Sequence, residues 1–183
     1  MMFPKSLSGL QMGVEAAAAN TYSCVSSPTQ YALAHSLRAD RAELDQYLAH
    51  CRNILREVAS YYYTRLTASG GCRAHLSEGT YYMMVDFEPL RESLKKAGIV
   101  TGQQMCDDMM AKFNIGLMPC GPHFVRDPLD LTVRFCFVNF DGAKPLKAVQ
   151  NGAKIDEALI QTECSEVLAG VETLLQWIAV YNN

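Results

Sequence analysis

Two strand-forming segments that lie far apart in the sequence constrain the fold most. The first covers residues 80–87 and is rich in aromatic and β-preferring side chains. The second covers residues 131–140 and is an almost continuous apolar, β-branched and aromatic run. Helical patterns precede the first segment, lie between the two segments and follow the second. We therefore predict an α/β fold of the layered α+β kind, in which a small antiparallel or mixed sheet packs against long helices.

A lone arginine, Arg134, interrupts the second of these strand patterns. Burying a guanidinium without a partner is costly, so Arg134 is expected to meet a carboxylate. The sequence offers Asp86, Asp130 and Glu78 as partners within the protein. The alternative is the carboxylate of a ligand, and the residues alone leave both possibilities open.

The remaining pattern is helical. Asp40 with Glu43, and Thr101 with Gln104, have the spacing of capping boxes, and Ser27 before Pro28 is typical of a helix start. Asp141-Gly142 indicates a turn. Apolar periodicity predicts helices over residues 6–19, 28–37, 40–66, 89–97, 101–113 and 155–180, a strand edge at 115–118 and an irregular loop at 119–122.

Composition excludes several classes of function. The formal net charge is -3 and the lysines and arginines are dispersed, so no nucleic-acid partner is expected. The seven cysteines are an odd number, which favours reduced thiols. The apolar stretches fall short of a membrane span, and the first residues do not have the pattern of a signal peptide. We expect a cytoplasmic protein with no membrane partner.

A metal site is not expected. Cys72 and His75 have a metal-like spacing, but no second Cys/His pair follows at a compatible distance along the chain. His123 lies in the Pro/Gly loop and is expected to be an exposed histidine without an acid or base role.

The order of these signals resembles the C-terminal part of a class I/II aminotransferase, a pyridoxal-phosphate enzyme of the aspartate aminotransferase fold type I. The segments that carry the resemblance are Phe3-Pro-Lys-Ser-Leu7, Thr21-Tyr-Ser-Cys-Val-Ser-Ser-Pro-Thr-Gln30, Glu78-Gly-Thr-Tyr-Tyr82 and Leu131-Thr-Val-Arg134. By this resemblance, residues 1–37 correspond to remnant helices of the large cofactor domain, and residues 38–183 to the C-terminal small domain.

The resemblance also implies a function, amino group transfer between an amino acid and a 2-oxo acid. Arg134 stands where the family has the arginine that binds the substrate α-carboxylate through a two-pronged ion pair. Ser26 and Ser27 lie in a segment that, in related dimers, reaches toward the cofactor phosphate of the neighbouring subunit. From the residues alone, these serines are an ordinary helix cap and loop. The full-length enzyme is expected to be a homodimer.

The chain departs from the family in what it lacks. The family holds its cofactor through a Schiff-base lysine, with a phosphate-binding arginine shortly after it. Lys5 has no arginine at the expected place behind it and is expected to be solvated. The loop Met118-Pro-Cys-Gly-Pro-His-Phe124 also differs from the family pattern. We therefore expect this chain to be inactive by itself. The alternative is a non-catalytic oligomerisation or interaction module derived from an aminotransferase small domain.

Overall fold

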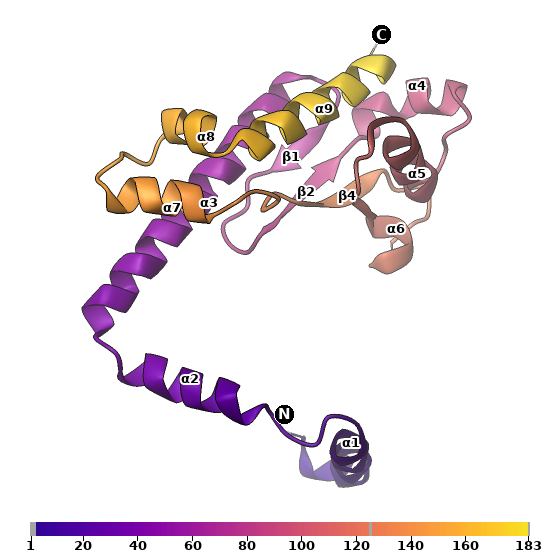
Figure 1. Ribbon diagram of the computed structural model, residues 1–183. Coiled ribbons are helices and arrows are strands. Elements are labelled where there is room, and N and C mark those ends of the chain that lie inside the picture. Colours follow the sequence, from indigo (N-terminus) through magenta and orange to yellow (C-terminus); the bar gives the residue numbers. More distant parts are fainter. Residues whose placement is uncertain (1–2, 125, 183) are drawn as a thin grey trace. The chain divides into compact units, whose positions relative to one another are not determined.

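The computed structural model describes residues 3–124 and 126–182 and divides the chain into two compact units, Met1–Gln46 and Tyr47–Asn183 (Figure 1). The resemblance places the domain boundary after residue 37, whereas the division into units falls after Gln46, within the helix α3 (Arg41–Ala68).

The first unit is helical. It contains the 3₁₀ turn η1 (Lys5–Leu7), α1 (Ser8–Thr21), α2 (Ser27–Arg38) and the start of α3. Helix α2 begins one residue earlier than predicted, because Ser26 is its cap and Pro28 lies in the first turn, where a missing N–H costs nothing. No described residue of this unit is buried, so its apolar side chains lie at the surface.

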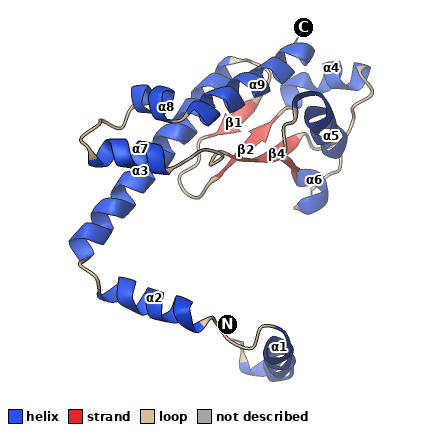
Figure 2. Cartoon of the chain, in the orientation of Figure 1, coloured by secondary structure: helices blue, strands red, loops and turns tan. Residues whose placement is uncertain are grey.

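The second unit contains a four-stranded antiparallel sheet with helices, which confirms the predicted α/β class (Figure 2). The strands are β1 (Arg73–His75), β2 (Tyr82–Asp86), β3 (Met118–Pro119) and β4 (Thr132–Cys136), in the order β1-β2-β4-β3. The helical elements of this unit, besides α3, are η2 (Glu88–Leu90), α4 (Arg91–Lys96), α5 (Gly102–Phe113), α6 (Cys120–His123), α7 (Ala143–Gln150), α8 (Glu157–Glu163) and α9 (Ser165–Tyr181).

One face of the sheet builds the core. Met83 and Val85 of β2 and Val133 and Phe135 of β4 alternate onto this face and are buried. Phe135 meets the ring of Tyr62 on α3 edge to face, with ring centroids 4.8 Å apart. The same core continues into α3, α5, α8 and α9, which therefore pack on this face of the sheet.

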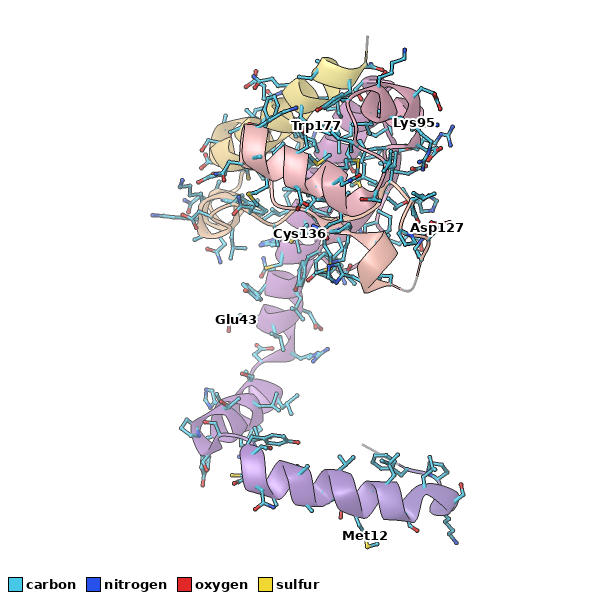
Figure 3. All side chains as sticks on the ribbon, turned by 90° about the vertical axis from the view of Figure 1, so that its right-hand side faces the viewer. Met12, Glu43, Lys95, Asp127, Cys136 and Trp177 are labelled. Atoms are coloured by element: carbon cyan, nitrogen blue, oxygen red, sulfur yellow. The ribbon has the colours of Figure 1, made fainter. Side chains whose placement is uncertain are left out.

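A polar cluster joins α5 to α9. Asp108 accepts hydrogen bonds from the indole Nε1 of Trp177 (3.0 Å) and the hydroxyl of Tyr181 (2.8 Å), and its other oxygen lies 2.7 Å from Lys112 Nζ. Burial alone raises the pKa of Asp108, but these three partners outweigh it and hold the pKa below its usual value. The fully buried Trp177, labelled in Figure 3, therefore has its one polar atom satisfied.

This cluster predicts a pH dependence of stability. A carboxyl whose pKa is lower in the folded state contributes stability above its unfolded value of about 3.9, and this contribution is lost as the pH falls through the folded value. We expect the free energy of unfolding, measured by urea titration, to fall from pH 5 to pH 3. Asp108→Asn should make this fall smaller, and an unchanged fall would contradict the assignment to Asp108.

Several elements differ from the predicted ones, and each difference has a local cause. Strand β2 starts at Tyr82 because Thr80 has a φ of 64°, which no strand residue adopts. The predicted helix over residues 155–180 is two helices, since Cys164 leaves the helical conformation (φ −126°, ψ 56°). Helix α7 is not among the predicted helices. It begins just after Asp141, whose carboxylate accepts a hydrogen bond from the N–H of Ala143. Part of the predicted loop at 119–122 forms α6.

The cysteines fall into two groups, which predicts their reactivity. Burial raises the pKa of Cys72 to about 11, of Cys106 to about 12 and of Cys164 to about 11. Cys24 and Cys136 are exposed free thiols. In a titration with Ellman's reagent at pH 8, we expect the exposed Cys24 and Cys136 to react first and the four buried cysteines to react only after denaturation; these are Cys72, Cys106, Cys120 and Cys164. Fast labelling of Cys106 in the native protein, located by peptide mass spectrometry, would contradict this.

Candidate functional site

The second face of the sheet, called the open face below, is partly exposed within the described part of the unit, although Thr132 at one end of it is buried at 8% exposure. Tyr82 and Met84 of β2 are each 39% exposed, whereas Met83 and Val85 on the other face are 1% and 0% exposed. The register pairs Met84 with Arg134 and Tyr82 with Cys136, so these four side chains share the open face. Figure 3 marks Cys136 on β4. An antiparallel sheet with one covered and one open face can present side chains to a ligand or to another surface.

Arg134 lies at the centre of this face. It is directly opposite Met84 on β2 and Met118 on β3, and it is half-buried. Its Cζ lies 4.3 Å from the ring centroid of Tyr82 and 5.9 Å from that of Phe124. A stacked ring contacts the flat face of a guanidinium, so the N–H edge stays available for hydrogen bonds.

The protein carboxylates proposed as partners for Arg134 are engaged elsewhere. Asp86 lies 3.9 Å from Arg73 and accepts the N–H of Glu88. Asp130 lies 2.5 Å from Arg126 and accepts the N–H of Thr132. Burial raises the pKa of Asp130, but the bonds from Thr132 and Arg126 outweigh this and lower it overall, so it is a satisfied anion.

Glu78, the third of these carboxylates, lies in the loop before β2 and makes no ion pair with a described residue. Across residues 3–124 and 126–182, Arg134 likewise has no ion pair. The charge of Arg134 is therefore not neutralised by a carboxylate of the described chain.

A small hollow adjoins this row of residues. It has a volume of about 200 Å³ and is lined by Arg73, Ala74, His75, Met84, Asp86 and Thr132. Met84 belongs both to this hollow and to the row that contains Arg134. Arg134 and Tyr82 do not line this hollow, so the carboxylate site proposed on this face consists of the cation with its free N–H edge beside the aromatic ring, without the hollow.

The described residues do not fit a pyridoxal phosphate bound through a lysine beside Arg134. None of the four strands carries a lysine. Lys112 is engaged with Asp108, Lys144 lies 3.6 Å from Glu166, and Lys5 is exposed in η1. The open face can therefore hold a carboxylate, but it does not supply the amine that the cofactor needs.

Ser26, Ser27 and His123, which were also singled out in the sequence, do not belong to the strands of this sheet. Ser26 and Ser27 belong to the first unit, where both are exposed, and Ser26 makes no side-chain cap bond. His123 is exposed at the end of α6. That Tyr82 and Phe124 flank Arg134 could not be predicted from the sequence pattern alone. The period of two along β2 and β4 places Tyr82 and Arg134 on a common face only once the register is known.

The sequence comparisons add no relative. No protein-family model matches the sequence, and no curated protein matches it.

Proposed function

We propose that this chain is the C-terminal part of a pyridoxal-phosphate-dependent aminotransferase, in which Arg134 binds the α-carboxylate of the amino acid or 2-oxo acid substrate. The observation that carries the proposal is the half-buried Arg134 at the centre of an open sheet face, without an ion pair to any described residue. The order of sequence segments from Phe3 to Arg134 supports the same assignment.

An arginine at this position of a strand is costly to desolvate without a partner. Its neighbours on the adjacent strands are Met84 and Met118, which offer no charge to balance the guanidinium. A leucine or valine would be buried at this position more easily, so the arginine serves a partner outside the described residues. A carboxylate matches the fork of the guanidinium with two parallel hydrogen bonds, which fixes both the position and the orientation of the substrate.

In this proposal the chain binds and orients the substrate, and another part of the protein holds the cofactor and moves the proton. That part would cover the open face and complete the site. The whole enzyme would be a homodimer. The seven free thiols support a reducing, cytoplasmic location. In the part of the chain that the structure describes, no helix is long and apolar enough to cross a membrane.

The coding sequence upstream of Met1, and the protein isolated from its source, test this proposal. An in-frame cofactor domain with a Ser-x-x-Lys segment, together with transaminase activity of the joined protein, is the expected result. We expect the 183-residue chain alone to show no Schiff-base absorbance with pyridoxal phosphate. A translation start at Met1 with no partner chain, or borohydride trapping of the cofactor on Lys5, would contradict the proposal.

The exposed apolar side chains of the first unit favour a second candidate, an oligomerisation module. Leu10 is 55% exposed and Tyr31 is 79% exposed, and neither α1 nor α2 has a buried residue. Light scattering after size exclusion separates the candidates. A stable, concentration-independent oligomer of the isolated chain, without any cofactor domain in the source, supports the module. A monomeric isolated chain would contradict the oligomerisation module.

A further inference from the structure

A second candidate site is a hollow of the second unit whose lining does not include Arg134, Tyr82, Met84 or Cys136. Its volume is about 670 Å³, within the range of roughly 300–1,000 Å³ that is usual for small-molecule pockets. One wall is the part of α3 from Leu48 to Ala59, and the other is the loop from Leu76 to Tyr81. Phe137, just after β4, closes it.

The apolar part of this pocket is large enough to hold an aromatic or alkyl group. Ala59 and Phe137 are each 2% exposed, so they form the base of the pocket. Leu76 and Tyr81 are exposed on the loop side, and Leu55 is half-buried on the helix side. An apolar ligand group in this space would cover side chains that are otherwise in contact with water.

Two exposed arginines give the helix wall of this pocket a positive charge. Arg52 and Arg56 both line it and are one helical turn apart on α3, so they lie on the same side of the helix. In the described part of the chain, Arg52 has no ion pair, and Arg56 only donates to the side-chain oxygen of Asn53 at 3.1 Å. By contrast, Arg65, which lies further along α3, is paired with Glu157 at 2.6 Å.

One carboxylate, that of Glu78, lines the loop side of the same pocket. It is not within ion-pair distance of Arg52 or Arg56 among the described contacts, so it does not neutralise them. The charged groups of the lining are therefore two cations and one anion, a net positive charge beside an apolar surface.

We propose that this pocket binds a small organic monoanion with an apolar body, an aryl-alkyl carboxylate. Its carboxylate is held by Arg52 and Arg56, and its apolar body lies against Leu55, Leu76 and Tyr81. This site shares no lining residue with the row of Arg134, so it does not depend on the proposed aminotransferase function.

The test uses 4-phenylbutyrate as the probe and its neutral amide, 4-phenylbutanamide, as the matched control. Both are titrated into the ¹⁵N-labelled 183-residue chain. We expect saturable amide shifts on α3 near Arg52 and in the loop 76–81, with the acid binding more tightly than the amide. Replacing both arginines (Arg52→Gln and Arg56→Gln) should weaken the acid by about five- to thirtyfold, as for two partly exposed ion pairs, and leave the amide unchanged.

Two further variants keep the test specific. Leu76→Ala should weaken the acid and the amide by the same factor, because it removes only apolar contact. Arg134→Leu should leave the affinity of 4-phenylbutyrate at this pocket unchanged, which separates this site from the proposed substrate site. Equal affinities for acid and amide, no effect of the double replacement, shifts confined to β4 or α1, or no binding up to millimolar probe would each overturn the proposal.

Discussion

Replacing Arg134 with leucine is expected to lower kcat/KM for the amino acid by roughly two to four orders of magnitude in the enzyme that contains this chain and its cofactor domain. The variant removes both hydrogen bonds of the two-pronged ion pair and leaves the substrate carboxylate facing Met84 and Met118. Loss of orientation lowers kcat, and loss of binding raises KM. Steady-state kinetics over a range of amino acid concentrations measures both.

Two control variants give this prediction its specificity. Arg73→Leu removes an arginine from the same sheet but from the edge strand β1, where it is exposed and pairs with Asp86. It should leave kcat/KM within a fewfold of the parent, on the scale of exposed ion pairs. Arg134→Lys keeps the charge but not the planar fork, so it should recover only part of the activity. Near-normal kinetics of Arg134→Leu would refute the role of Arg134.

Replacing Trp177 with alanine is expected to lower the free energy of unfolding of the second unit by about 3–5 kcal/mol, as for other buried tryptophans. Trp177 is fully buried, its ring meets that of Phe87 edge to face at 5.5 Å, and its indole donates to Asp108. Alanine leaves a large cavity and also removes one of the donors that hold Asp108 as an anion. Urea unfolding followed by circular dichroism measures the change.

Trp177→Phe separates packing from hydrogen bonding. It keeps an aromatic ring but removes the indole N–H and part of the ring volume, so it should lower the free energy of unfolding by less than Trp177→Ala does, by about 1–3 kcal/mol. Tyr181→Phe is the matched removal of the second neutral donor to Asp108 and should have a similar effect. If Trp177→Ala costs no more than Trp177→Phe, the core of the second unit does not depend on this ring.

Where a local rule determines the structure, the sequence was sufficient to predict it. The capping box of α5 forms as predicted, with Gln104 N–H donating to Thr101 Oγ1 at 3.2 Å and the Gln104 side chain accepting the N–H of Thr101. The long helix α3 and the strands around Met83 and Val133 follow from apolar periodicity and β propensity. Arg134 stood out because a charge in such a strand is costly.

Where the structure depends on contacts between distant segments, the sequence was not sufficient. β1 has three residues and exists because Ala74 pairs with Val85 of β2. The break at Cys164 is invisible to periodicity, since Ile160 and Val167 are seven residues apart and fit a continuous helix. The ring of Phe124 near Arg134 comes from a loop whose path no periodic pattern specifies.

The binding of a 2-oxo acid by this chain tests the role of Arg134 directly. Pyruvate, titrated into the ¹⁵N-labelled chain, should shift the Arg134 side-chain Nε–H and the amides of β2 and β4. A Kd on the order of 10 mM is expected, since one charge-assisted pair contributes about 3 kcal/mol. Pyruvamide should cause no such shift, and Arg134→Leu should abolish the response, whereas Arg73→Leu should retain it. Equal shifts with pyruvamide, or a response that persists in Arg134→Leu, would contradict the assignment of this face as a carboxylate site.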